Sequence, residues 1–135
     1  MTNSNQIRIA VIGTSGSGKS TLAKIAALKL KIDYIEQDQL FWLPNWQEVP
    51  KEQFQKAVLE KIPGDSWSIC GNFSSHQENI WNRATHIIWL NYPLRIALAR
   101  GFRRTLKRVF LKEECCNGNR ESFRHAFMSK NSILW

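Results

Sequence analysis

Short apolar runs alternate with amphipathic segments along most of this chain. Three of the runs, at residues 7–12, 67–71 and 86–90, are mainly apolar, and a fourth at 32–38 ends in acidic residues. Apolar runs of this length are typical of parallel strands that are buried on both faces. The pattern therefore predicts four parallel strands.

The segments between these runs have helical spacing, with apolar residues recurring every three or four positions. They predict helices over 19–31, 51–62, 74–84, from Pro93 to about Leu111, and 120–128. The first helix is expected to bury one face, made of Leu22, Ile25, Ala26 and Leu30. Ser74 or Ser75 is expected to cap the third. The stretch 39–50 is predicted to be a loop or a short irregular helix, and 112–119 a loop.

Strands that alternate with helices imply a parallel α/β sheet. The chain has 135 residues, which is the size of one domain. We expect a single domain over 1–135. No run of 18 apolar residues occurs, so no membrane span is expected.

The first residues are polar and lead directly into a strand, so no signal peptide is expected. The three cysteines are Cys70 and the adjacent pair Cys115 and Cys116, which do not suit a disulfide framework or a zinc site. We expect a reducing cytoplasm as the location. The oligomeric state cannot be inferred from these features.

Positive charge is concentrated in the last third of the chain. The net charge is +8, and residues 95–135 hold ten Lys and Arg against three Asp and Glu. This segment is therefore expected to bind a polyanion, which can be a nucleotide, a nucleic acid or an anionic lipid. Composition does not choose between these partners.

A phosphate-binding loop follows the first strand. The stretch GTSGSGKST matches G-x-x-x-x-G-K-[ST] at every fixed position, between a predicted strand and a predicted helix. Glycines let backbone N–H groups turn toward an anion, and the helix adds its positive N-terminal end. Lys19 is expected to reach the β- and γ-phosphates of ATP, and Ser20 to coordinate Mg²⁺. The predicted nucleotide-binding residues are Gly13, Thr14, Ser15, Gly16, Ser17, Gly18, Lys19, Ser20 and Thr21.

Other phosphate-loop classes lack support in this chain. A GTPase needs NKxD and DxxG segments, and neither string occurs. Motor and helicase ATPases carry a hydrophobic strand that ends in Asp, whereas the strand 86–90 is followed by Asn91. A small phosphotransferase is the class that remains.

Two acidic residues end the second predicted strand. Strand alternation places Glu36 and Asp38 on the same side, at the carboxyl edge where open α/β sheets bind ligands. A carboxylate there can accept a proton from a substrate hydroxyl or hold Mg²⁺ through water. We favour Asp38 as the catalytic residue and as a second metal ligand, because it lies nearer the phosphate loop.

Arginines recur at helical spacing in the basic segment. Arg100, Arg104 and Arg108 lie on one helix face, and Arg120 and Arg124 repeat the spacing beyond the loop 112–119. Arginine stabilises the charge that develops on a transferring phosphoryl group. The loop between two arginine-bearing helices is expected to be a lid, at about 110–124, that closes over ATP.

Several segments together resemble one family. GTSGSGKSTLA, IEQDQLFWLPNW, GNFS at 71–74, HIIWLNYP and the R-x-x-RR stretch followed by C-x-GNRESF are similar to the bacterial DNA topology modulation proteins, a group of adenylate-kinase-like P-loop proteins. The spacing of Asp38, Trp42 and Trp46, together with GNRE, is the narrowest part of the resemblance. The similarity implies a three-layer P-loop NTPase sandwich like that of the nucleoside monophosphate kinases, with a small arginine-rich lid.

The resemblance also implies roles for individual residues. Arg100 would lie against the adenine, Arg103 or Arg104 near the phosphates, and Arg120 and Arg124 on the lid. Asp38 would border the acceptor pocket with Trp42 and Trp46 nearby, above a floor at 71–72. The family has Asp in place of Asn91 and continues beyond SILW, so this chain is expected to lack a last strand and helix.

These observations favour a phosphotransferase that moves the γ-phosphate of ATP to a small-molecule or nucleotide acceptor. The catalytic residues would be Lys19, Asp38, Arg104, Arg120 and Arg124. The alternative is a nucleic-acid-associated ATPase or regulator that affects DNA topology and uses the basic segment to bind DNA or RNA. A chain that binds nucleotide without catalysis is a third hypothesis.

Overall fold

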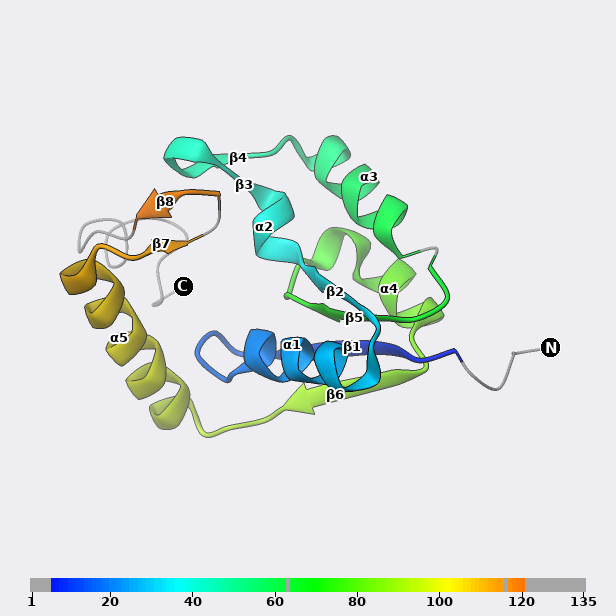
Figure 1. The fold of residues 1–135 in the computed structure, drawn as a ribbon, viewed down its shortest axis with the longest axis horizontal. Helices are drawn as coiled ribbons and strands as arrows, with labels where there is room; N and C mark the ends of the chain where they lie inside the picture. The colour runs from blue at the N-terminus through cyan, green and yellow to red at the C-terminus, as the bar shows by residue number, and fades with distance from the viewer. Residues whose placement is uncertain (1–5, 63, 116, 121–135) are drawn as a thin grey trace.

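A four-stranded parallel sheet forms the centre of the computed structural model, which describes residues 6–62, 64–115 and 117–120 (Figure 1). The strand order is β2-β5-β1-β6, and every pairing is parallel. The strands are β1 (Arg8–Gly13), β2 (Asp33–Glu36), β5 (Trp67–Cys70) and β6 (His86–Leu90). Each predicted strand is confirmed, with bounds that differ by at most two residues at either end.

Helices cover both faces of the sheet. On one face α1 (Lys19–Leu30) packs on Ile9 and Val11 of β1. On the other face lie α3 (Lys51–Lys61) and α4 (Gln77–Arg83), whose buried residues are Phe54, Val58 and Ile80. The result is a three-layer sandwich, as predicted.

Helix α1 packs through residues other than those predicted. Its buried residues are Ala23 and Ala27, whereas Ile25 and Leu30 are each 45% exposed. Leu22 and Ala26 are partly buried against the sheet. The small alanine side chains let the helix lie close to β1 and β5, which turns the larger residues outward. The predicted inner face was therefore half wrong.

The segment after β2 is built from short elements. Helix α2 (Gln37–Phe41) begins directly at the end of the strand, and β3 (Trp42–Leu43), a 3₁₀ turn at Pro44–Trp46 and β4 (Gln47–Glu48) follow. The predicted strand 32–38 was too long, because helix geometry begins at Gln37. Asp38 therefore lies on the first turn of a helix, and its presumed strand alternation with Glu36 was wrong.

The remaining elements lie at the carboxyl side of the sheet. A 3₁₀ turn at Ser74–His76 precedes α4, and neither Ser74 nor Ser75 caps it with a side-chain hydrogen bond, so the predicted cap was wrong. Pro93 caps α5 (Leu94–Leu111) as expected. The predicted loop 112–119 contains a two-stranded hairpin, β7 (Glu114–Cys115) and β8 (Asn119–Arg120).

Figure 1 shows α5 at one side of the molecule and the β7–β8 hairpin next to the β3–β4 segment. The predicted helix 120–128 begins at a residue that belongs to β8, and its later part lies outside the described residues. Within the described residues, no helix is both long enough and apolar enough to cross a membrane.

Candidate phosphate-binding site

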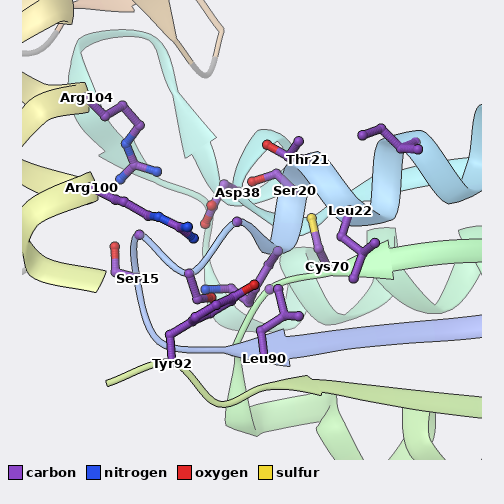
Figure 2. Close-up of a pocket in the computed structure, with 16 residues that line it drawn as sticks. Ser15, Ser20, Thr21, Leu22, Asp38, Cys70, Leu90, Tyr92, Arg100 and Arg104 are labelled. Atoms are coloured by element: carbon purple, nitrogen blue, oxygen red, sulfur yellow. The ribbon is translucent and has the colours of Figure 1, made fainter. Parts of the chain in front are cut away.

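A cavity lies at the carboxyl edge of the sheet, above the ends of β1, β5 and β6 (Figure 2). Its volume is about 550 Å³. This edge collects residues from distant segments because all four strands are parallel and end there. The lining residues are Ser15, Gly16, Ser17, Gly18, Lys19, Ser20, Thr21, Leu22, Ile25, Asp38, Cys70, Gly71, Leu90, Tyr92, Arg100 and Arg104.

The loop between β1 and α1 has the shape of an anion-binding nest. Gly16 and Gly18 have φ of 78° and 91°, and α1 begins immediately after them. The Lys19 ammonium donates a hydrogen bond of 2.9 Å to the Thr14 carbonyl, which holds it over the loop. The Ser17 hydroxyl is buried, and it has no hydrogen-bond partner among the described residues. An oriented set of donors of this kind fits a polyphosphate.

Gly16 packs directly against α5. A Cβ at this position would lie 2.2 Å from the Ala97 carbonyl oxygen and 3.0 Å from the Gly101 nitrogen. Ala97, Gly101 and Thr105 form the buried face of α5, spaced every four residues. The sequence analysis missed this face. Gly101 and Thr105, the small residues that follow Arg100 and Arg104, indicated in the sequence that this helix packs closely against another segment.

Two arginines of α5 reach the cavity. Arg100 and Arg104 extend from the helix toward the phosphate loop and Asp38 (Figure 2). The Arg100 guanidinium also lies over the Tyr92 ring, 4.8 Å from its centroid. Tyr92 was not predicted, although its position just after β6 places it at the ligand-binding edge. Arg103 is exposed and does not line the cavity, because one residue along the helix turns its side chain by about 100°.

Asp38 and Lys19 influence each other across the cavity. Burial among protein atoms raises the pKa of Asp38, although its side chain opens onto the cavity, and the charges of Lys19, Arg104 and Arg108 oppose this shift. Burial lowers the pKa of Lys19, and Asp38 opposes that shift. Asp38 therefore lies among cations on the side of the cavity opposite α5.

A hydroxyl and a carboxylate face the cavity as possible metal ligands. Ser20 and Asp38 both line it, and the described residues contain no group of three His, Cys, Asp or Glu that would hold a metal by itself. Mg²⁺ is usually coordinated by one or two protein groups together with substrate phosphates and water. The donor set fits Mg²⁺ delivered with a nucleotide.

Cys70 lines the same cavity but is not activated. Burial raises the pKa of the thiol to about 11, and the Tyr34 hydroxyl lies 3.7 Å from Sγ. A thiol with a raised pKa is a poor nucleophile at neutral pH. Cys70 therefore forms part of the cavity wall.

The hairpin β7–β8 contacts the segment that follows Asp38. The Asn119 side chain accepts a hydrogen bond from the Trp46 backbone N–H (2.9 Å) and donates one to the Leu43 carbonyl (2.8 Å). The Trp46 indole donates to the Arg120 carbonyl at 3.1 Å. The Asn117 side chain donates to the Gln39 and Trp42 carbonyls. The predicted lid segment is therefore attached to the residues that follow Asp38.

This attachment bears on the predicted roles of Arg120, Trp42 and Trp46. The Arg120 side chain forms an ion pair with Glu114 of its own hairpin at 3.3 Å and does not line the cavity. Arg124 lies outside the described residues. Trp42 and Trp46 pack edge-to-face, with ring centroids 5.4 Å apart, and neither lines the cavity.

Comparison with known proteins places this geometry in context. The structure matches a gluconokinase from Sinorhizobium meliloti with a TM-score of 0.56 and 19% identity, over 76% of this chain and 67% of that chain. Together with the parallel sheet and the loop before α1, this match identifies the fold. The chain has a P-loop kinase fold of the nucleoside-monophosphate-kinase type.

Two curated relatives match by sequence. A cytidylate kinase from Fervidobacterium nodosum is 38% identical over 60 residues, which cover 41% of this chain and 27% of that protein. A cytidylate kinase from Carboxydothermus hydrogenoformans is 37% identical over 70 residues, which cover 44% of this chain and 32% of that protein. The aligned part thus spans about a third or less of each relative. No family model matches the chain.

Proposed function

We propose that this chain is an ATP-dependent phosphotransferase that transfers the γ-phosphate of ATP to a small-molecule or nucleotide acceptor. The observation that carries the proposal is the convergence of Lys19, Asp38 and Arg104 on one cavity from three distant segments. The cytidylate kinase relatives and the gluconokinase-like fold support the same reaction class. Both kinds of acceptor named by these relatives, a nucleotide and a sugar acid, remain within the proposal.

Each group has a part in the proposed reaction. The amides of the loop and Lys19 hold the β- and γ-phosphates, and the Ser17 hydroxyl can donate to the same oxygens. Ser20 would hold Mg²⁺, which neutralises charge on the phosphate oxygens. Arg104 stabilises the charge on the transferring group, and Arg100 with Tyr92 borders the nucleotide.

Asp38 has a role that depends on the acceptor. With a hydroxyl acceptor, the oxygen attacks the γ-phosphorus, its proton passes to the Asp38 carboxylate, and ADP leaves. With a phosphate acceptor the attacking oxygen is already ionised, and Asp38 would instead help to hold Mg²⁺. The first role makes turnover much more sensitive to removal of the carboxylate.

Replacement of Asp38 tests this assignment. We expect Asp38→Asn to bind MgADP within about threefold of the wild type, because the phosphate loop is intact, and to lose about 10²–10⁴-fold in turnover of a hydroxyl acceptor. Calorimetry gives the affinity, and coupled ADP release with gluconate, CMP and related nucleosides and sugars gives the turnover. Asp33→Asn, at the far end of β2, is the matched control. Unchanged turnover in Asp38→Asn would refute the catalytic role.

The nucleic-acid alternative is supported by the charge of the basic segment and predicts a different result. In that case, polynucleotide would increase ATP hydrolysis, and its binding would weaken steeply with salt. The same assay, run with and without DNA and RNA, distinguishes the two. Failure of MgADP or MgATP to bind the folded chain would refute both.

A further inference from the structure

Two buried polar side chains lie next to residues that line the cavity. Gln37, the first residue of α2, is 3% exposed, and His76, at the end of the 3₁₀ turn before α4, is 2% exposed. The His76 Nε2 and Gln37 Oε1 atoms are 2.6 Å apart. The Ser75 hydroxyl lies 3.1 Å from the other ring nitrogen, Nδ1.

The chemistry of the amide determines the state of the imidazole. The Gln37 oxygen can only accept, so the His76 Nε2 carries the proton and donates it. Nδ1 then has a lone pair that accepts from the Ser75 hydroxyl. A neutral imidazole therefore satisfies both contacts.

The pair is connected to both sides of the cavity. Gln37 precedes Asp38, so its side chain anchors the first turn of the helix that carries the carboxylate. The same side chain presses on Gly71, where an added Cβ would meet Gln37 at 2.8 Å and where φ is +134°. The next residue, Asn72, donates a hydrogen bond to the carbonyl of Gly13, which begins the phosphate loop.

The surroundings of His76 give it no direct access to substrate. Its ring packs against Phe54 at 4.9 Å and Phe73 at 6.4 Å between centroids, and it does not line the cavity. A buried polar pair in such an aromatic environment adds little net stability, because an apolar pair of the same shape is often equally stable. Its contribution is the directed contact to Gln37.

We propose that His76 is a positioning residue that, through Gln37, sets the place of the Asp38 carboxylate relative to the phosphate loop. This inference rests on the proposed function, because it concerns the residue assigned to the acceptor. It predicts that the protein still folds when His76 and Gln37 are both replaced, but that the Asp38 carboxylate is then misplaced.

The test is a shape-conserving double variant, His76→Leu with Gln37→Met, against the wild type. We expect thermal unfolding and MgADP affinity close to those of the wild type. We expect the titration midpoint of Asp38, followed by carboxyl ¹³C NMR, to move by about half a pH unit or more. Turnover should fall at least about tenfold. A folded double variant with an unchanged Asp38 titration would overturn the proposal.

A second variant covers the case in which the double variant does not fold. Gln37→Glu keeps the size and the acceptor, and a carboxylate there is expected to raise the pKa of His76. Among the described residues, the groups against the ring are Phe54, Phe73, Ser75 and residue 37, of which only the new glutamate titrates. The pH profile of turnover should then shift with the imidazole. A shifted His76 titration with an unchanged profile would overturn the positioning role.

The two proposals fail in different ways. If the wild type shows no turnover with any acceptor, the phosphotransferase function fails, while the Asp38 titration still decides the positioning role. If Asp38→Asn is inactive and the double variant titrates and turns over as the wild type does, only the positioning role fails.

Discussion

Burial moves the pKa values of single residues at this site in directions that matter for its chemistry. The pKa of Asp38 is raised and that of Lys19 is lowered, and each group stabilises the charged form of the other. A carboxylate with a raised pKa is a better proton acceptor than one with the usual pKa, while the cationic neighbours of Asp38 oppose the shift. The sequence identified both residues, but not the balance of burial and charge between them.

His76 gives a residue-scale prediction about acid stability. Burial lowers its pKa below the usual value, so at mildly acidic pH the unfolded chain binds a proton there that the folded chain does not. Folding stability should therefore fall as the pH drops below about 6.5 and fall further until the folded pKa is reached.

The double variant His76→Leu with Gln37→Met should lack this contribution. Urea unfolding at about pH 7.5 and about pH 5 should show a smaller loss of stability than in the wild type, by up to roughly 1 kcal/mol. The exposed His86 is the control site, and His86→Gln should lose stability with pH as the wild type does. An equal loss in the double variant would show that other groups cause the acid sensitivity.

At the scale of elements, the site depends on how closely α5 approaches the phosphate loop. The small residues Ala97 and Gly101 admit Gly16, and the same helix turns Arg100 and Arg104 into the cavity. One face of α5 therefore packs against the loop, and the adjacent face lines the cavity. The arginine spacing was visible in the sequence, whereas the partner of the small-residue face was not.

Gly16→Ala tests this contact. The methyl group would lie 2.2 Å from the Ala97 carbonyl oxygen, so the loop or the helix has to move. We expect a loss of about 2–4 kcal/mol in stability and a loss of at least tenfold in MgADP affinity.

Gly118→Ala is a matched control, because φ there is +79° and an added Cβ meets nothing within 4 Å. Gly118→Ala should lose only about 1 kcal/mol of stability, because its positive φ disfavours a residue with a side chain but the added methyl group meets no neighbour. Thermal unfolding and calorimetry measure both effects. Equal losses in the two variants would mean that the approach of α5 to the loop has no energetic role.

The hairpin β7–β8 gives a second prediction at this scale. Asn119 is buried and joins the hairpin to Leu43 and Trp46. Asn119→Ala should cost about 1–3 kcal/mol, because it removes the side-chain partner of a backbone N–H and of a carbonyl. The exposed Asn82→Ala on α4 is the control, and tryptophan fluorescence should report detachment of the hairpin only in the first variant. The absence of any difference would contradict the attachment.

At the scale of the whole molecule, the excess positive charge is partly gathered at the cavity and partly spread over exposed surface. Arg100 and Arg104 line the cavity, whereas Arg103, one residue before Arg104, is exposed outside it. Net charge alone predicts a polyanion partner, and the position of each arginine predicts which polyanion.

Two variants of equal net charge separate these effects. Arg104→Ala is expected to weaken MgATP binding about tenfold or more, because it removes a cation from the phosphate site. Arg103→Ala is expected to leave the affinity within about twofold, because Arg103 does not line the cavity and salt screens its charge from the ligand. Calorimetry at physiological ionic strength measures both. Equal weakening would favour a diffuse polyanion surface and, with it, the nucleic-acid alternative.

Local patterns in the sequence were sufficient for the strands, the phosphate loop and most of the helices. Apolar runs and helical spacing report burial directly, and the loop residues are close together in the chain. The predicted bounds of elements were wrong where the backbone geometry changes but the pattern of apolar and polar residues does not. At Gln37, for example, a helix begins in a stretch that continues the pattern of β2. The hairpin at 114–120 was not predicted from the sequence, because its strands are only two residues long.

What the sequence alone determined is the glycine-rich loop between β1 and α1 and the parallel α/β architecture, because both depend on residues that are neighbours along the chain. Only the tertiary structure decided which arginines reach the loop, why Gly16 faces Ala97, and how His76 and Gln37 support Asp38. These contacts join residues separated by tens of positions, and they exist only because parallel strands bring their carboxyl ends to one edge. Packing across that edge, which no local pattern encodes, converts the scattered residues into a site.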